Sequence, residues 1–250
     1  MKILIVQNIS RENPGLIEEV LNERNLEFDI VDLNEKDFTD PSNYDAVFVL
    51  GGPDSANDKT PKMEKELQRV KEIINSEIPY FGVCLGMQVL VKSDCGDVYP
   101  NHVKEVGCKD NNGKYYEVEL TAEGFKDQIF AGIKSPFKIF QLHGETVALK
   151  NGTKLLGTGK HCRHQIVKAC NNAYGIQGHL EVTELMLENW LYEDTMFDNH
   201  DKNSIMKDFK SLKNEYYSNG IKLKNNFLDL AENQMKKELL KSAVCKFNKK

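Results

Sequence analysis

The fold of this chain is decided by the stretch Ile78-Pro79-Tyr80-Phe81-Gly82-Val83-Cys84-Leu85-Gly86-Met87-Gln88-Val89-Leu90-Val91. Residues 78–83 form an apolar run that predicts a buried strand, and residues 87–91 predict the start of a helix. Between them, Gly82-Val83-Cys84-Leu85-Gly86 has the pattern of a nucleophile elbow with cysteine at the centre. Such a turn lifts the Cys84 side chain clear of the sheet onto the N-terminus of a helix, which favours a thiolate.

This pentapeptide permits two interpretations. In the functional one, Cys84 is a nucleophile and the Leu85 N–H points to the place where an oxyanion would form. In the other, Cys84 is a buried small residue in a turn that needs glycine for close packing. The pentapeptide alone does not separate these interpretations.

On the N-terminal side of this stretch, apolar runs that predict strands alternate with helical stripes. The strands are expected at residues 2–6, 26–33, 44–50 and 78–83, and the helical stripes at 16–21 and 63–74. This alternation predicts an α/β fold with an open, mostly parallel sheet and helices on both faces. Right-handed crossovers are the default for such connections.

On the C-terminal side, between about residues 97 and 178, the expected strands are short and glycine or asparagine turns separate them. They are expected at 98–99, 115–120, 138–141, 146–149, 154–157, 165–169 and 173–177. This region is predicted to extend the sheet and to add antiparallel ribbons. A helix is predicted at Thr183 to Tyr192.

The last part of the chain carries an imperfect helical stripe. We predict a domain over residues 1–192 and a helical extension over residues 193–250 that packs on it. The extension is expected to be one or two helices, because the apolar stripe is interrupted near Asn219-Gly220. Packing on the domain is favoured over two sharper roles, a lid and an oligomer contact.

Composition narrows the class of protein. The chain has 250 residues, a net charge of −5 and 28% charged residues, with no basic block. An acidic chain of this kind is a poor candidate for binding nucleic acid or an anionic membrane. Its apolar runs fall well short of the roughly 20 residues that span a bilayer, and the first residues do not form a signal peptide. We therefore expect a cytoplasmic protein that binds small molecules or protein partners.

The cysteines are scattered through the sequence. They stand at positions 84, 95, 108, 162, 170 and 245 with no CxxC pair. In a reducing compartment such cysteines are mostly small buried residues, so a role for Cys84 needs partners elsewhere in the chain.

The segment His179-Leu180-Glu181 offers such partners, because a thiolate nucleophile needs a base and a group that orients the base. It follows the strand predicted at 173–177. Side chains two residues apart leave an extended chain on the same face, so Glu181 can hold one ring nitrogen of His179 while the other faces Cys84. A lone histidine is more often a surface or core residue. We assign that role to His102, His161, His164 and His200.

A third element is the turn Gly51-Gly52-Pro53, which follows the strand predicted at 44–50. Ligands of open α/β sheets bind beyond the carboxyl ends of the strands. The Gly52 N–H is our candidate for a second oxyanion donor beside the Leu85 N–H. The alternative is that these glycines only allow close packing.

Taken together, these residues resemble the class I glutamine amidotransferase family. The motifs that carry the resemblance are Gly51-Gly52-Pro53-Asp54-Ser55, Gly82-Val83-Cys84-Leu85-Gly86-Met87-Gln88 and Tyr174-Gly175-Ile176-Gln177-Gly178-His179-Leu180-Glu181-Val182-Thr183. The resemblance covers roughly residues 1–190. The segments at 96–101 and 141–146 look like motifs of its GMP-synthase-like subgroup, whose stand-alone members often carry a C-terminal helical extension. The resemblance implies a flavodoxin-like fold.

The resemblance also implies a reaction. Cys84 would attack the side-chain amide of glutamine, form a γ-glutamyl thioester and release ammonia. Water activated by His179 would then release glutamate, and Glu181 would orient His179. Gln88, by its motif position, would help to bind glutamine; its alternative is a helix residue that faces solvent. We expect neither a metal nor a cofactor.

Two positions depart from the family pattern. The family usually has an aromatic residue before the histidine, where this chain has Gly178, and many members have proline where this chain has Leu180. Leucine is familiar in the stand-alone subgroup. Gly178 is expected to remove bulk beside His179, which would loosen the histidine or enlarge the pocket.

The fate of the ammonia is open. The chain has neither a P-loop nor a glycine-rich pyrophosphatase loop, so no synthetase domain is predicted here. One hypothesis is a glutaminase that serves a separate synthetase or acceptor subunit. A second is a stand-alone hydrolase of γ-glutamyl amides, and a third is a non-catalytic regulatory module on the same scaffold. The Cys84, His179 and Glu181 set favours the first two.

Overall fold

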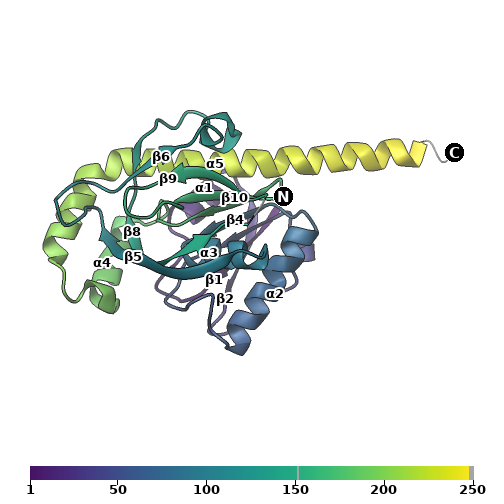
Figure 1. The fold of residues 1–250 in the computed structure, drawn as a ribbon. Helices are drawn as coiled ribbons and strands as arrows, with labels where there is room; N and C mark the ends of the chain where they lie inside the picture. The colour runs from purple at the N-terminus through teal and green to yellow at the C-terminus, as the bar shows by residue number, and fades with distance from the viewer. Residues whose placement is uncertain (151, 248–250) are drawn as a thin grey trace.

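The protein is built around a nine-stranded mixed sheet (Figure 1). The computed structural model describes the backbone of residues 1–150 and 152–247, and the side chains up to residue 240 apart from residue 151. In spatial order the strands are β2 (Glu27–Asp32), β1 (Lys2–Gln7), β3 (Ala46–Val49), β4 (Tyr80–Val83), β11 (Ala173–Ile176), β10 (Ile166–Ala169), β9 (Lys154–Thr158), β6 (Glu117–Leu120) and β7 (Phe137–Lys138). The strands from β2 to β11 pair in parallel, and the rest of the sheet is antiparallel.

Helices cover both faces of the parallel part. Alternate residues of β1 enter two different cores: Ile3 and Ile5 pack with the helices of one face, and Leu4 and Val6 with those of the other. This is why the strand reads as a continuous apolar run. The first face carries α1 (Leu16–Glu23), α4 (Glu184–Glu193) and α5 (Lys202–Phe247), and the second carries α2 (Pro61–Asn75) and α3 (Leu85–Ser93). The predicted fold class is confirmed.

Local signals in the sequence set the starts of the helices. Thr60 caps α2 through its hydroxyl, which accepts the Met63 N–H at 3.2 Å, and Pro61 occupies the first turn. Thr183 caps α4 in the same way, with the Met186 N–H at 3.2 Å. The end of α4 lies within one residue of the predicted Tyr192.

The ribbon of β5 (Asp97–Gly107) and β8 (Gln141–Ala148) corrects two expectations. Two separate strands were expected at 138–141 and 146–149, but residues 141–148 form a single strand, β8. The expected strand at 98–99 is likewise much longer. The two strands pair around a register shift between Pro100 and Glu105.

The helix α5 is one continuous element of 46 residues, so of the two alternatives, one helix or two, the structure has one across Asn219-Gly220. The helix crosses the sheet, where Phe227 packs edge-on against Phe48 and Phe81 at centroid distances of 5.0 and 5.4 Å. Figure 1 shows its last turns projecting beyond the sheet. The division at residues 192 and 193 into domain and extension stays a prediction.

Gly220 lies inside α5 for a reason of packing. A Cβ at this position would collide with the carbonyl oxygen of Leu180, so the helix approaches the chain after β11 as closely as a backbone can. The glycine that looked like a helix breaker instead permits this contact.

Among the described residues, no helix is both long and apolar enough to cross a bilayer.

We expect Gly220→Ala to destabilise the protein by about 1–3 kcal/mol, because the added methyl group forces α5 away from Leu180. At an exposed helical position the same change stabilises by about 0.5–1 kcal/mol, so the sign is diagnostic. Chemical denaturation measures the difference, with Ser218→Ala on the exposed side of the same turn as the control. A stabilised Gly220→Ala variant would mean that α5 does not press on this segment.

Candidate active site

Cys84 occupies the turn between β4 and α3 in a backbone conformation that side-chain-bearing residues rarely adopt. Its φ is 50°, and its N–H donates to the Ile176 carbonyl at 2.8 Å, which ties the turn to β11. A Cβ on Gly86 would collide with the Val49 carbonyl oxygen, so the glycine allows α3 to start directly on the sheet. A strained residue held by surrounding contacts is typical of a functional position.

His179 and Glu181 lie together beside Cys84. The His179 Nδ1 atom is 2.6 Å from Glu181 Oε1, and both side chains are at least 97% buried. The other carboxylate oxygen of Glu181 accepts the Leu180 N–H at 3.0 Å. The second ring nitrogen of His179, Nε2, is buried without a hydrogen bond of ordinary geometry. The sequence-predicted Cys84, His179 and Glu181 are therefore brought together.

The charges of this group support each other. Burial alone would disfavour an imidazolium, but Glu181 and the nearby sulfur of Cys84 outweigh it and hold the pKa of His179 well above its usual value. Burial would also raise the pKa of Glu181, but the His179 charge, its hydrogen bond and the Lys224 charge hold that pKa below its usual value. The arrangement favours a protonated imidazole paired with an ionised carboxylate.

The backbone of this segment is fixed by side chains of α5. The Tyr216 hydroxyl donates to the His179 carbonyl at 3.0 Å and accepts the Val182 N–H at 3.3 Å. The Tyr217 hydroxyl accepts the Glu184 N–H at 2.9 Å. With Gly220 against Leu180, α5 therefore contacts each part of the turn that carries His179 and Glu181.

Lys224 is a buried cation beneath this turn. Its side chain is 1% exposed, and its ammonium donates to the Leu180 carbonyl at 2.8 Å. Burial lowers the pKa of Lys224 to about 8, although the charge of Glu181 opposes that shift. Lys224 in turn helps to keep Glu181 ionised. No local pattern in the sequence indicates this role, because a lysine in an amphipathic stripe usually faces solvent.

Gly178 leaves no empty space beside His179. A Cβ there would lie 2.6 Å from Gln141 Oε1 and 2.8 Å from Ile139 Cδ1, so these side chains already fill the position. Trp190 supports the imidazole instead, with ring centroids 5.2 Å apart. The expectation of an enlarged pocket beside Gly178 is therefore wrong, and the expectation of a loosened His179 stays a prediction.

The glycine turn after β3 lies against Cys84. A Cβ on Gly51 would be 3.4 Å from Cys84 Cβ, and one on Gly52 would be 3.4 Å from Leu85 Cδ2. Gly52 and Leu85 are thus neighbours on two sides of the nucleophile candidate. Their role as oxyanion donors stays a prediction.

Gln88 is buried, so the alternative interpretation of a helix residue that faces solvent is wrong. Its side chain is 4% exposed and donates to Gln177 Oε1 at 3.3 Å. Gln177 in turn donates to Cys84 Sγ at 3.7 Å, and the Cys84 thiol points to the Leu142 carbonyl at 3.8 Å. We assigned no role to Gln177, although it stands two residues before His179 in the same motif.

Two hollows meet at Cys84. Both are walled by Gly52, Pro53, Cys84, Leu142 and Met196. The Gln88 hollow has a volume of about 320 Å³ and is further lined by residues that include Ser55, Gln88, Lys104 and Glu145. The Glu12 hollow has a volume of about 340 Å³ and is further lined by Arg11, Glu12, Glu193, Asp194 and Thr195.

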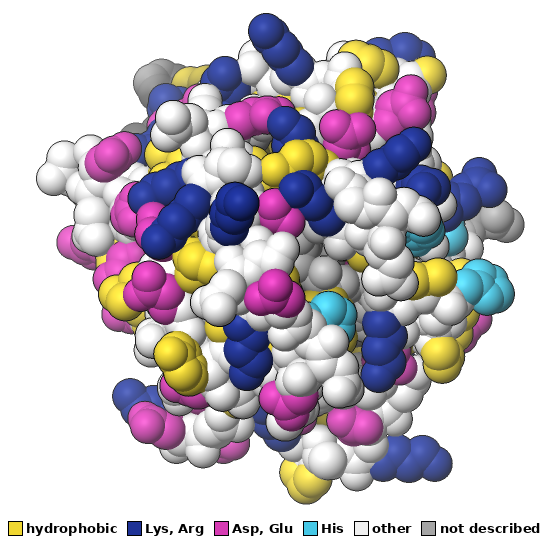
Figure 2. Space-filling view, turned by 90° about the vertical axis from the view of Figure 1, so that its left-hand side faces the viewer, with side chains coloured by type: hydrophobic (Ala, Val, Ile, Leu, Met, Phe, Trp, Pro, Cys, Tyr) yellow, Lys and Arg dark blue, Asp and Glu magenta, His cyan; other side chains and the backbone are white. Residues whose placement is uncertain are grey.

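The surface that carries α4 and the β5–β8 ribbon is mixed in charge. Figure 2 shows basic and acidic side chains interspersed on this face, with scattered hydrophobic ones. His102, His161, His164 and His200 line neither hollow, and their role as surface or core residues stays a prediction. His161 instead pairs with Asp110 at 3.1 Å.

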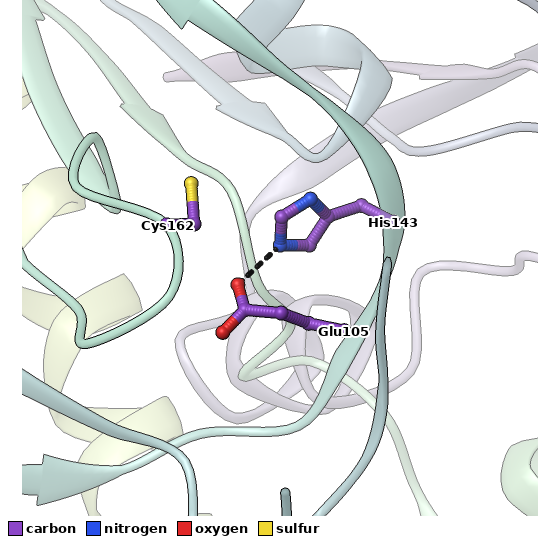
Figure 3. Close-up of side chains that lie close together, drawn as sticks. All are labelled: Glu105, His143 and Cys162. Atoms are coloured by element: carbon purple, nitrogen blue, oxygen red, sulfur yellow. Dashed lines mark hydrogen bonds and ion pairs between the residues drawn. The ribbon is translucent and has the colours of Figure 1, made fainter. Parts of the chain in front are cut away.

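A second cysteine, histidine and glutamate set lies nearby (Figure 3). Glu105, His143 and Cys162 are buried, and their ligand atoms lie within 4.8 Å of one another, so this set could hold a metal ion. His143 Nε2 already pairs with Glu105 Oε2 at 2.8 Å, however, and Nδ1 faces the Glu145 carbonyl at 2.9 Å. Burial raises the pKa of the Cys162 thiol to about 11, which suits a structural residue rather than a nucleophile. The set braces the β5–β8 ribbon that walls the hollows.

We expect Lys224→Met to change how stability depends on pH. Because the Lys224 pKa is depressed to about 8 in the folded protein, the wild type gains about 2–3 kcal/mol of unfolding free energy from this group between pH 7 and pH 10. Methionine cannot titrate, so the stability of the variant relative to wild type should fall by that amount as the pH rises. Denaturation of both proteins at several pH values measures it. A difference that is independent of pH would place Lys224 in solvent.

Comparison with known sequences agrees with this geometry. The family profile described as glutamine amidotransferase class-I matches residues 8–199. A GMP synthase (glutamine-hydrolyzing) of Borreliella burgdorferi strain N40 is 28% identical over 158 residues, which are 60% of this chain and 28% of that protein. A glutamine amidotransferase-like protein of Salmonella typhimurium, YfeJ, is 26% identical over 145 residues, which are 56% of this chain and 58% of that protein. The chain therefore spans about a quarter to three fifths of the length of these relatives.

Solved structures show the same fold. A glutamine amidotransferase from Thermotoga maritima superposes with a TM-score of 0.79 at 24% identity, covering 91% of this chain and 97% of that one. A glutamine amidotransferase from Methylobacillus flagellatus gives a TM-score of 0.79 at 19% identity, over 91% and 94% of the two chains. With the family profile spanning most of its length, this chain belongs to the class I glutamine amidotransferase family.

Proposed function

We propose that this protein hydrolyses the side-chain amide of glutamine through a thioester on Cys84 and supplies the ammonia to a separate acceptor subunit. The observation that carries the proposal is the buried His179–Glu181 pair, with its 2.6 Å hydrogen bond, facing a cysteine on the strained turn before α3. Membership of the amidotransferase family supports amide hydrolysis as the reaction type.

In the first half of the reaction, the Cys84 sulfur attacks the amide carbon while His179 carries the thiol proton. The Gly52 and Leu85 N–H groups would donate to the oxyanion, since they flank the nucleophile. His179 then gives its proton to the departing nitrogen, the C–N bond breaks and a thioester remains on Cys84. The raised pKa of His179 suits this acid step.

In the second half, His179 takes a proton from water, and the resulting hydroxide attacks the thioester carbonyl. The C–S bond breaks, glutamate leaves and the proton returns to Cys84. Glu181 stabilises the imidazolium in both halves by its charge and holds the ring by its hydrogen bond. Gln88 would contact the substrate, because it lines the hollow beside Cys84.

The acceptor is proposed to be a separate protein. The motifs of this chain resemble those of the stand-alone members of the GMP-synthase-like subgroup, which supports an acceptor on another chain. We place the protein in the cytoplasm, in keeping with its composition. A pull-down that captures a synthetase would identify the partner. Light scattering of the purified protein tests whether it forms an oligomer through α5.

We expect Cys84→Ser to lose at least about 10³-fold in kcat while it keeps the fold, because a hydroxyl at this site is far harder to ionise than a thiol. Release of ammonia and glutamate from glutamine measures activity, and thermal unfolding checks the fold. A glutamine-like chloroketone should label Cys84 in preference to the other cysteines. The proposal fails if the serine variant still hydrolyses glutamine at near wild-type rate, or if labelling is spread evenly over the cysteines.

We expect Glu181→Gln to cost less activity than His179→Ala, by about tenfold or more in kcat. The amide can still accept the ring N–H of His179, but it cannot stabilise the imidazolium by charge, whereas alanine removes the acid and base itself. The kcat values of both variants on glutamine test this order. Equal losses would indicate that Glu181 shapes the turn through its bond to Leu180 rather than acting through His179.

A further inference from the structure

The side chain of Glu12 is a buried carboxyl that the proposed reaction does not use. It is 6% exposed, and it forms no hydrogen bond or ion pair with any residue in the described part of the chain. It lines the Glu12 hollow beside Cys84. The Glu12 oxygens are not among the fully buried atoms without a partner, so they open onto this hollow, where the charges of His179 and Arg11 act on them. A ligand in the hollow can therefore contact this carboxyl directly.

Glu12 reaches the catalytic group across the glycine turn. A Cβ on Gly51 would collide with Glu12 Oε2 and would lie 3.3 Å from His179 Cε1 and 3.4 Å from Cys84 Cβ. One small region of space is therefore bordered by the carboxyl, the imidazole and the nucleophile. Only a glycine at position 51 lets the Glu12 carboxyl lie this close to His179 and Cys84.

The chemistry decides which half of the substrate enters the Glu12 hollow. The departing nitrogen must take a proton from His179, so it must leave on the imidazole side of Cys84. Glu12 Oε2 and His179 Cε1 both border the position that a Cβ on Gly51 would take, whereas Gln88 and Glu145 line the other hollow. The acyl half then occupies the Gln88 hollow, and the amine half occupies the Glu12 hollow.

The size and charge of the Glu12 hollow indicate what kind of amine it takes. Its volume of about 340 Å³ far exceeds the roughly 30 Å³ that a water-sized molecule such as ammonia occupies. Its acidic residues are Glu12, Glu193 and Asp194, and the one cation, Arg11, already pairs with Asp194 at 2.6 Å. The lining therefore favours a positively charged group.

We propose that the Glu12 hollow is the subsite for the amine half of the substrate, and that Glu12 selects γ-glutamyl amides whose departing amine carries a second, positively charged nitrogen. The proposal rests on the proposed thioester chemistry of Cys84, but it makes an organic amine the leaving group; release of ammonia for an acceptor is the alternative that the test separates from it. The reaction is a hydrolysis: one water is consumed, the amide C–N bond breaks, His179 protonates the amine, and glutamate and a free amine are the products.

The test compares two amides that differ only in charge. The γ-glutamyl amide of ethylenediamine carries an ammonium where that of propylamine carries a methyl group. At pH 8 we expect the wild-type kcat/KM for the first to exceed that for the second by about tenfold or more, as for a hydrogen bond to a charged group. In Glu12→Gln this ratio should fall towards one.

Two controls sharpen the measurement. Asp54→Asn removes a carboxylate from the Gln88 hollow, where Asp54 pairs with Lys62 at 2.7 Å, and it should keep the wild-type ratio. The wild-type ratio should also shrink at pH 6, because burial raises the pKa of Glu12 to about 7. The charged groups that act on Glu12 there are His179 and Arg11, which favour its ionisation, and Glu181 and Asp194, which oppose it.

The outcomes separate the two proposals. A wild-type ratio near one, or a ratio that survives in Glu12→Gln, overturns the subsite. Hydrolysis of glutamine with neither substituted amide accepted also overturns the subsite but leaves the proposed function standing. Failure to hydrolyse glutamine or either amide overturns both. The wild-type ratio needs no variant, so a Glu12→Gln protein that does not fold would still leave the proposal falsifiable.

Discussion

The contact between α5 and the turn at residues 179–184 is the constraint on which the site depends. Tyr216 holds the His179 carbonyl and the Val182 N–H, Lys224 holds the Leu180 carbonyl, and Gly220 lets the helix backbone press against Leu180. The imidazole and the carboxylate project from a segment with no regular secondary structure, so their geometry is only as fixed as that backbone. An error of about 1 Å in such a group can cost ~10²-fold in rate.

The same contact resolves an electrostatic problem. His179, Glu181 and Lys224 are all at least 97% buried, and an unpaired charge at any of them would be costly. Together they form a chain in which Glu181 lies between two cations, so each ionised state is supported by a neighbour. A helix outside the parallel sheet therefore contributes to the charge of the catalytic pair as well as to its position.

The sequence predicted the parts of the site that are local. The turn around Cys84 follows from five consecutive residues. The two-residue spacing of His179 and Glu181 indicated their contact, although the segment between them bends rather than running as an extended strand. Tyr216, Lys224 and Glu12 were missed, because their contacts join segments far apart in the chain that periodicity cannot pair. The period of α5 shows that the helix packs, but not on what. The role of Gly220 was missed because a close approach to a distant carbonyl leaves no local signal.

The most direct test of this account is a titration of His179 by NMR in the isotopically labelled protein, with a His179→Gln variant to assign the signal. The account predicts that the imidazole stays protonated through neutral pH, since Glu181 and Cys84 hold its pKa well above the usual value. It also predicts that Glu181→Gln moves the midpoint down. A His179 that titrates near the ordinary value of about 6.5, unchanged by Glu181→Gln, would contradict the claim that this pair forms the catalytic centre.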